Sequence, residues 1–596
     1  MRRGAATAIG LAAASLSSCA PHPPLPPEVR AAMKTVGVEL KIPQRPPFPK
    51  PTAQSVEVTL TPLTWRTGNI LASFGLPFPP DMIPDDSRIS VEDAAGKEVP
   101  VFTKPLVKWW IDRKEGTNRS VLVQFEVRVP DRAKTPQKFL VRWDKVRTRN
   151  RPEQVPVDRT QDVVPVSPGF PPAQPGLAAF LTFPATQPAL LATRLAPVVS
   201  LRPPAATQPT TAMLPTTGPG RRRRPEFQPV ATSFDFRQPK ILATLPAQWL
   251  CDSLLVWQQV PAAQNQVASW FDEHFDRQFP GSPKWITAGR DGSESYLFDR
   301  AATYAKAYAR SGKAEHLLAA LQAVDYYIQH IGYSGLFAYA GDDLKYVLTE
   351  GPALAYMLTG DERYPAVIAQ MTKAWERHTD IEYTDPEMFW TERHTGFGLM
   401  AYLHSYEITG NLAHLDKAQR FFEAALAMQV QPGDGKEPVG AWLHTARSHT
   451  DGNGWTTSPW MSAFLTDAIW KYWMNSGDPR APASLLMYAK YAQRYCITPD
   501  GTSTWYMANA PGRGTSVGVG RGSTGVPRDE THNMEGAYLM ALGHYLSGGL
   551  DPGYLPKIQT LYPPMLAEDS ANEPGRKFNW RFRETSMLVW FLANTP

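Results

Sequence analysis

Two runs of hydrophobic positions between residues 390 and 426 recur at helical spacing. In the first run Leu399, Leu403 and Tyr406 share one face, and further apolar residues widen it, which predicts a buried helix. In the second run an apolar stripe extends from residue 415 to residue 425 and charged residues fill the opposite side, which predicts a half-exposed helix. The pattern therefore predicts a helical hairpin with one buried helix and one outer helix.

The two ends of the first helix carry recognisable signals. Thr391 suits the N-cap position, and Gly410 suits the left-handed position that ends a helix. The same ending, a Ser-Gly or Thr-Gly pair after an apolar helical run, occurs at Ser311-Gly312, Thr359-Gly360, Thr409-Gly410, Ser476-Gly477 and Ser547-Gly548. We therefore expect five such hairpins in series along the chain.

Polar side chains recur near the expected start of these helices. Counting 18 residues back from each glycine leads to Glu294, Asp342, Glu392, Pro459 and Glu530. At about 1.5 Å per residue these positions lie roughly 27 Å before the glycines, near the helix N-termini. Two residues later stand Tyr296, His394 and His532. A ring of hairpins would bring these groups to one opening.

Helical periodicity begins near residue 245 and continues to the end of the chain. Residues 246–275 predict a first hairpin, and the apolar run 578–594 closes the chain. Six hairpins in about 350 residues predict an (α/α)6 toroid, in which the first helices line the inside. An open α-solenoid is the alternative, but the long loops after residues 430, 497 and 562 favour the toroid.

Residues 55–150 show a different pattern, because apolar and polar positions alternate between Gly, Pro and Asp turns. This alternation predicts an antiparallel β-domain. Residues 20–54 and 151–244 are rich in proline and predict a tether and a linker or insertion. The expected fold class is a multidomain α+β protein, with the β-domain at 55–150 and the (α/α)6 toroid at 245–596.

The β-domain also carries a resemblance to a known family. The run from Ser73 to Phe102, followed by Trp109-Trp110, Asp112 and the strand VLVQFEV, resembles the N-terminal β-domain of exo-rhamnogalacturonan-lyase-like proteins. In that family such a domain precedes an (α/α) toroid, so the resemblance implies an enzyme that acts on carbohydrate. The sequence IDRKEGTNRS stands where a compact Trp-Asp-Gly-Ser turn is expected, and no catalytic residue carries over from this domain.

The chain begins with Arg2 and Arg3, an apolar run from residue 5 to residue 16, and small residues before Cys19. This arrangement resembles a bacterial lipoprotein signal at residues 1–19, with Cys19 as the lipidated residue. An ordinary secretory signal is the alternative. Since no later apolar run is long enough to span a bilayer, we expect a cell-envelope protein that contacts the membrane through its lipid alone.

The charge of the chain is divided unevenly. Residues 245–596 hold 28 Lys and Arg against 37 Asp and Glu, so the first 244 residues hold the other 33 basic and 19 acidic groups. The helical half is therefore acidic, which gives no support to a nucleic-acid partner. With Cys19 assigned to the lipid, Cys251 and Cys496 allow at most one disulfide.

The expected opening combines carboxylates, cations and aromatic rings, which is what binding of a polysaccharide or oligosaccharide needs. The candidate catalytic residues are Glu392, Arg393, His394, His532, Tyr296 and Glu530. The candidate substrate-binding residues are Asp342, Arg300, Trp455, Asn533, Trp505 and Arg583. We expect no cofactor, and no metal, since His444 and His449 lack a strong ligand spacing.

Two reactions fit these residues. A polysaccharide lyase needs a cation or amide to hold a uronate carboxylate, a base and an acid. The carboxylate would be held by Arg393, Asn533 or Arg583. The base would be His394 or His532, and the acid would be Tyr296 or a histidine. A glycoside hydrolase needs two carboxyl groups about 5 to 9.5 Å apart, such as Glu392 with Asp342 or with Glu530. The arginine and histidines favour the lyase. A glycan-binding protein without turnover is the third hypothesis.

Overall fold

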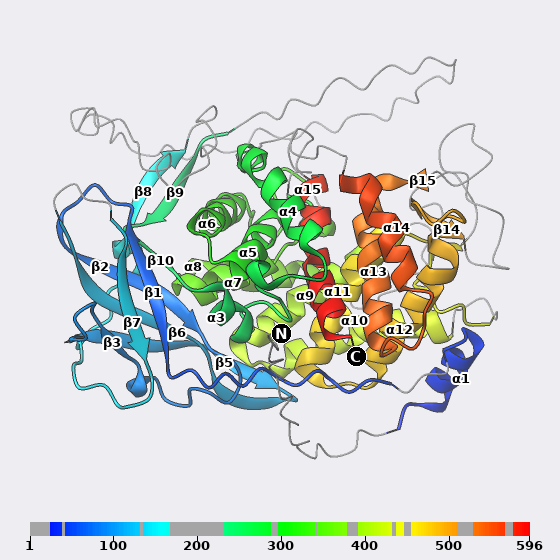
Figure 1. Ribbon diagram of the computed structural model, residues 1–596, viewed down its shortest axis with the longest axis horizontal. Coiled ribbons are helices and arrows are strands. Elements are labelled where there is room, and N and C mark those ends of the chain that lie inside the picture. Colours follow the sequence, from blue (N-terminus) through cyan, green and yellow to red (C-terminus); the bar gives the residue numbers. More distant parts are fainter. Residues whose placement is uncertain are drawn as a thin grey trace, which may run out of the picture.

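The computed structural model describes residues 24–38, 42–130, 135–166, 232–287, 296–340, 343–377, 391–431, 437–445, 455–509, 528–566 and 576–595. Strands dominate the first part of the chain and helices the second. The two parts lie side by side, with the strands on the left and the helices on the right of Figure 1. The predicted order, with strands in the first part of the chain and helices in the second, is therefore confirmed.

Two antiparallel sheets make up most of the β part. One has the strand order β10-β1-β7-β3-β4 and the other the order β2-β6-β5. Their strands are β1 (Ser55–Pro62), β2 (Gly68–Pro77), β3 (Ser90–Glu92), β4 (Glu98–Val99), β5 (Val101–Ile111), β6 (Lys114–Val129), β7 (Gln137–Arg142) and β10 (Ile241–Thr244). A further antiparallel pair joins β8 (Gln161–Val166) to β9 (Phe234–Pro239). Strands β8 to β10 come from the stretch predicted as a linker.

The core of the β part follows from the alternation of its side chains. On β1, Val56, Val58 and Leu60 are all buried, because every second side chain of a strand points to the same face. The rings of Phe125 on β6 and Phe139 on β7 lie 5.0 Å apart, so the two sheets contact each other through these side chains.

Helix hairpins follow in series, each with a mostly buried first helix and a more exposed second helix. They are α5 (Arg300–Ser311) with α6 (Ala314–Gln329), α7 (Glu350–Thr359) with α8 (Arg363–Ala374), α9 (Glu392–Thr409) with α10 (Leu412–Val430), α11 (Pro459–Ser476) with α12 (Arg480–Tyr491), and α13 (Asn533–Leu546) with α14 (Leu555–Leu566). The series predicted from the recurring Ser-Gly and Thr-Gly pairs is confirmed.

The glycines end these helices as predicted. Gly410 has a φ of 68° and donates its N–H to the carbonyl of Tyr406 at 2.7 Å, and Gly477 has a φ of 67° and bonds the carbonyl of Trp473 in the same way. Glycine adopts this left-handed conformation without steric cost. Each helix therefore stops where the sequence pattern places its end.

The starts of the helices are less regular than predicted. Helices α9 and α11 begin 18 residues before their glycines, but α5 begins at Arg300 and α7 at Glu350. Helix α5 starts late because Asp299 caps it, accepting the N–H of Ala302 at 2.9 Å. The expected row of carboxylates at one level is therefore not formed by α5 and α7.

The end of the chain closes the series of hairpins. It forms α15 (Arg576–Phe582), the 3-10 helix η12 (Glu584–Met587) and α16 (Leu588–Asn594). Helix α16 packs against α13, and α15 packs against α5, so the first and last hairpins meet through this segment. The predicted first hairpin appears as two short helices, α3 (Ala247–Asp252) and α4 (Ser269–Gln278), and α3 packs on α5.

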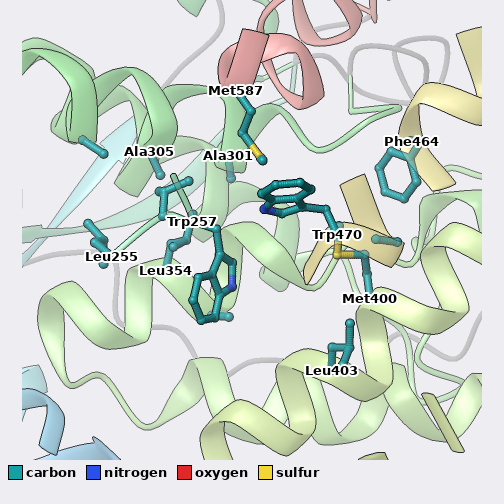
Figure 2. Packing of buried hydrophobic residues seen from close by; sticks show 14 of the residues in the cluster. Leu255, Trp257, Ala301, Ala305, Leu354, Met400, Leu403, Phe464, Trp470 and Met587 are labelled. Carbon is teal, nitrogen blue, oxygen red and sulfur yellow. The ribbon is translucent and has the colours of Figure 1, made fainter. Parts of the chain in front are cut away.

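Apolar side chains fill the middle of the helical part. Figure 2 shows Ala305 of α5, Leu354 of α7, Met400 of α9 and Trp470 of α11 converging there. The indole N–H of Trp470 donates to the side-chain oxygen of Gln258 at 2.8 Å. The centre is thus packed, and a substrate would have to bind at one end of the first helices.

The sheet β2-β6-β5 covers the C-terminal ends of three first helices. A Cβ at Gly410 would meet the Trp110 ring at 2.3 Å, and one at Gly75 would meet the Met357 carbonyl at 2.0 Å, so neither position has room for a side chain. Beneath this contact Arg119 of β6 pairs with Glu407 of α9 at 3.0 Å, and both are buried. The N-terminal ends of α9, α11 and α13 lie away from the sheet.

The stretch predicted as a tether is packed where it is described. Helix α1 (Pro27–Thr35) buries Val29, Ala32 and Met33 and packs against α10 and α12. Farther along, Arg45 pairs with Asp112 at 2.7 Å. The proline-rich composition predicted a tether, but the three apolar residues of this stretch are spaced to lie on one face of a helix, and that helix is packed.

Two further observations concern the membrane and the cysteines. Across the described ranges, no helix combines the length and the apolar character needed to cross a membrane. Cys251 and Cys496 are both free and buried, so the disulfide that the sequence allows is not formed.

Candidate active site

The second residue of α11, Trp460, is the centre of a cluster of functional side chains. The ring of His532 stacks on its indole, with centroids 4.6 Å apart and an angle of 11° between the planes. The guanidinium carbon of Arg393 lies 5.4 Å from the same indole, and the rings of Tyr506 and Trp580 lie 5.4 and 5.7 Å from it. We refer to these five residues as the Trp460 cluster. Three helix starts, one loop and the helix that carries Trp580 build it.

The residues before α11 fix the position of Trp460. Ser458 precedes the helix and Pro459 occupies its first turn, where a fixed φ and a missing N–H suit a helix start. Just before them, β12 (Trp455–Thr457) pairs with β14 (Ala508–Asn509), and this pairing brings the segment that carries Tyr506 to the same helix start.

His532 is held by a carboxylate one helical turn later. Its Nδ1 lies 2.8 Å from Oε1 of Glu535, and both side chains are buried. Burial raises the pKa of Glu535 to about 8, and the charge of Arg581 opposes this rise. Trp580 lies 4.4 Å from the imidazole on another side. The imidazole is therefore fixed in orientation and linked to a titratable group.

Arg393 gives the cluster its positive charge. Burial lowers its pKa from the ordinary value, and the neighbouring carboxylate of Asp343 opposes that shift. Burial alone would raise the pKa of Asp343, but hydrogen bonds from His394 and Lys345 outweigh it and hold the pKa below the ordinary value. The Asp343 side chain keeps 28% of its surface exposed, so the Arg393 side of the cluster borders solvent.

His394 serves the start of its own helix. Its Nδ1 accepts the backbone N–H of Thr391 at 3.2 Å, which completes a capping box at the N-cap predicted for Thr391. Nδ1 must therefore carry a lone pair, and Nε2 lies 3.7 Å from Asp343. Burial lowers the pKa of His394 to about 4. This geometry gives His394 a capping role, whereas the sequence predicts that it acts as a base.

Glu392 points away from the Trp460 cluster. Its Oε1 accepts bonds from the Thr457 hydroxyl at 2.9 Å and the Ser458 N–H at 3.2 Å, and Nδ1 of His444 lies 3.0 Å away. Its side chain is fully buried. The carboxylate thus joins α9 to the segment before α11 and has no surface to offer a substrate.

Other candidates from the sequence form structural bonds elsewhere. The Tyr296 hydroxyl donates to the Ile286 carbonyl at 2.7 Å, and Arg300 donates to the Ser282 carbonyl at 2.9 Å. The Asn533 amide donates to the Thr502 and Leu561 carbonyls, both at 2.9 Å. All three are buried, so the polar residues at the expected spacing satisfy backbone groups instead of meeting at one opening.

Arg583 lies in a central ion cluster beneath the Trp460 cluster. The members of this central ion cluster are Lys306, Glu350, Asp467, Lys471 and Arg583, all of them buried. Arg583 pairs with Glu350, and its Nη1 lies 3.2 Å from Asp467. Three cations around two carboxylates hold α5, α7, α11 and the closing segment together. Arg583 is therefore paired inside the protein, which excludes the predicted contact with substrate in this arrangement.

The remaining predicted residues lie apart from the cluster or outside the described residues. Trp455 on β12 and Trp505 on β13 (Thr504–Trp505) are half-buried. Glu530 is the first residue of the 3-10 helix η11 (Glu530–His532), but its side chain lies outside the described part of the structure. Asp342 and Cys19 lie outside the described residues altogether.

Tyr506 and Glu535 are polar residues near the expected opening in the sequence, but neither they nor Asp343 are among the site residues predicted from it. Each is a close neighbour of a predicted residue, because Tyr506 follows Trp505, Asp343 follows Asp342, and Glu535 stands three residues after His532. The His-x-x-Glu spacing at a helix start was the available signal, since residues three apart on a helix face each other. Within the described residues no group of three or more His, Cys, Asp or Glu side chains forms a metal site.

Comparisons with known proteins add similar structures but no family. No protein-family model matches the chain, and neither does any curated protein. Similar solved structures include a glycosyl hydrolase family 88 protein from Bacteroides vulgatus, at 11% identity and a TM-score of 0.39, covering 55% of this chain and 100% of that one. A polysaccharide lyase has 13% identity and a TM-score of 0.37, covering 55% of this chain and 99% of that one.

A third similar structure is an unsaturated glucuronyl hydrolase specific for heparin, at 10% identity and a TM-score of 0.37, covering 54% of this chain and 96% of that one. All three proteins are named as carbohydrate-processing enzymes. Their TM-scores lie below 0.5, so function has to be argued from the side chains of the site. The resemblance of the β-domain to exo-rhamnogalacturonan-lyase-like proteins stays a prediction.

Proposed function

We propose that this protein is a polysaccharide lyase that cleaves a uronate-containing glycan by β-elimination. One observation carries the proposal: Arg393, Tyr506 and His532 surround a single indole, that of Trp460. These are a cation, a phenol and an imidazole, which are the three groups that elimination beside a carboxylate needs. In our proposal the helical part works as an (α/α)6 toroid with this cluster at its open end.

The proposed roles follow from the chemistry of each side chain. Arg393 binds the uronate carboxylate and stabilises the negative charge that develops when the C5 proton leaves. His532 removes that proton, the C4=C5 double bond forms, and the bond from C4 to the leaving oxygen breaks. Tyr506 gives its hydroxyl proton to the leaving oxygen. Proton transfer from the protonated His532 through solvent restores Tyr506 for the next turnover.

A glycoside hydrolase is the alternative, and the burial of Glu392 argues against the version expected from the sequence. Both expected carboxylate pairs contain Glu392, which is fully buried and bonded to Thr457 and Ser458. An acid that protonates a glycosidic oxygen has to reach it. A glycan-binding protein without turnover would not need the bond between His532 and Glu535.

We also propose that the mature protein is anchored in the cell envelope by a lipid on Cys19. The support is the sequence pattern before that cysteine. Replacement of Cys19 by Ala is expected to move the full-length protein from the membrane fraction to the soluble fraction of bacterial cells. Membrane association that persists in C19A would overturn the anchor.

The test of the reaction uses the protein with panels of uronate-containing and neutral polysaccharides. Lyase action produces ultraviolet absorbance from the new double bond together with reducing ends. We expect H532Q and R393Q each to lower kcat by about 100-fold or more, as removal of a base or of a charge stabiliser does. Y506F tests the acid, and Y333F is its matched control because Tyr333 is fully exposed.

Each outcome separates the hypotheses. Reducing ends without absorbance would assign the protein to the hydrolases. Binding of glycan without either signal would make it a binding protein. Full turnover in Y506F and H532Q, with Y333F also unchanged, would remove the Trp460 cluster from the reaction.

A further inference from the structure

His532 and Glu535 form a fixed pair at the start of α13. The bond between Nδ1 and Oε1 measures 2.8 Å, and the imidazole lies against both Trp460 and Trp580. An imidazole packed against two indoles cannot rotate by half a turn about its bond to Cβ, so its two nitrogens do not exchange places. Nδ1 therefore always faces Glu535, and Nε2 is the nitrogen on the other side of the ring.

The second oxygen of Glu535 is buried and has no hydrogen-bond partner within the part of the chain that the structure describes. Glu584 of η12 shares this property, since both of its carboxyl oxygens are buried without such a partner. It pairs with the cation Arg583, whose Nη1 lies 3.7 Å from Oε2. That guanidinium is also engaged by Glu350 and by Asp467. Glu535, which holds His532, and Glu584 are thus two buried carboxyl groups with little compensation for a negative charge.

The charged groups that act on this pair come from α15, from α11 and from the residue before η12. Arg581 of α15 acts on Glu535, and Arg583 and Asp467 act on Glu584. Burial raises the pKa of Glu535 to about 8 and raises the pKa of Glu584 well above its ordinary value. The negative charge of Glu535 raises the pKa of Glu584 further, so the two carboxyl groups titrate as a coupled pair.

We propose that Glu535 decides which nitrogen of His532 carries the proton. When Glu535 is a carboxylate, it accepts a bond from Nδ1–H, and Nε2 keeps a lone pair and acts as a base. When Glu535 is a carboxylic acid, its O–H donates to Nδ1, and the single proton of the neutral imidazole sits on Nε2. Ionisation of Glu535 releases one proton to solvent and shifts the imidazole proton from Nε2 to Nδ1.

Glu535 is a positioning residue in this proposal, since it acts through His532. The catalytic consequence rests on the proposed function, in which His532 is the base, but the tautomer change itself does not. Activity should rise with pH as Glu535 ionises. Glu584 keeps its proton while Glu535 ionises, so replacement of Glu584 by Gln should leave the midpoint of this rise nearly unchanged.

The test observes the imidazole directly. The protein is labelled with ¹⁵N-histidine, and nitrogen spectra are recorded between about pH 5.5 and pH 9, the range in which such a pair titrates. The signal of His532 is identified as the one missing from H532Q. We expect its protonated nitrogen to change from Nε2 to Nδ1 in the wild-type protein, at nearly the same pH in E584Q, and not at all in E535Q.

The outcomes keep the two proposals apart. A single His532 tautomer at every pH in the wild-type protein would overturn the switch, whatever the enzyme does to a glycan. A tautomer change with the expected variant behaviour, but no double-bond product from any glycan, would uphold the switch and reject the lyase. Where activity is found, its pH midpoint should agree with the spectroscopic midpoint of the same protein.

Discussion

At the scale of single residues, the two histidines predicted as bases are separated by their hydrogen bonds. His394 accepts a backbone N–H with Nδ1, while His532 bonds a carboxyl group. A base needs a nitrogen free to accept a proton and a pKa near the working pH. Since the pKa of His394 is lowered to about 4, His394 does not meet this requirement, and the base in our proposal is His532.

Substitution of His394 should therefore affect stability more than turnover. H394A removes the acceptor for the Thr391 N–H and should lower the free energy of unfolding by about 0.5 to 2 kcal/mol, as loss of a cap does. H394Q keeps an acceptor at the third helical position, as in a common capping box, and should recover most of that loss. Urea unfolding and turnover are measured on both. Turnover of H394Q as low as that of H532Q would return His394 to proton transfer.

The sequence placed the correct types of residue at the start of α9 and α13 but could not tell their directions. Glu392, Arg393 and His394 are consecutive, and three consecutive residues of a helix project about 100° apart. One faces the segment before α11, one the Trp460 ring and one the backbone of its own cap. Periodicity identifies a helix start, whereas the partners of each side chain depend on neighbouring elements that are distant in sequence.

At the scale of elements, the helix ends were predictable because they rest on local chemistry. A glycine in the left-handed conformation ends α9 and α11 where the Thr-Gly and Ser-Gly pairs stand. The helix starts were less predictable because Asp299 caps α5 at a position that the spacing rule did not contain. The same glycines also meet the sheet, since Gly410 lies against the Trp110 ring, and this contact depends on the fold of the β part.

The contact between the β part and the helices includes a buried ion pair that should be important for stability. Arg119 pairs with Glu407 at 3.0 Å, and Trp257 and Asn475 donate further bonds to the carboxylate. Burial alone would raise the pKa of Glu407, but Arg119 together with Lys471 and the bond from Asn475 outweighs it, and the pKa is lowered to about 2. Glu407 is therefore charged, and it depends on Arg119 for compensation.

We expect R119M to lower the free energy of unfolding by about 3 to 5 kcal/mol, because it leaves a buried carboxylate without its partner. The double variant R119M with E407L should recover part of this loss, since it removes both charges. The exposed pair of Lys138 and Glu57 gives a control, and K138M should change the free energy by less than about 1 kcal/mol. An R119M effect no larger than that of K138M would show that the two parts do not depend on this pair.

At the scale of the whole molecule, the helical part keeps several imidazoles neutral in its interior. Burial lowers the pKa of His274, His316 and His404 to about 3 and that of His394 to about 4. The ordinary value is about 6.5. This property bears on the pH range in which the protein stays folded.

The direction of the pH effect follows from proton uptake. Below about pH 6.5 the unfolded chain binds a proton at each of these histidines, whereas the folded protein does not until about pH 3 to 4. The unfolded state therefore binds more protons in this window, and the free energy of unfolding falls as the pH falls. Each such histidine contributes a slope of up to about 1.4 kcal/mol per pH unit.

A substitution at His316 tests this explanation, because that residue lies near Ser311 and Phe279 and away from the Trp460 cluster. Urea unfolding is measured at pH 5, 7 and 8 for the wild-type protein and H316Q. The loss of stability between pH 7 and pH 5 should be smaller in H316Q by up to about 2 kcal/mol, since one group no longer takes up a proton on unfolding. Between pH 7 and pH 8 the two proteins should respond alike, because His316 is neutral in both states there. An equal loss of stability between pH 7 and pH 5 in both proteins would mean that carboxyl groups, and not the buried imidazoles, set the acid limit of the fold.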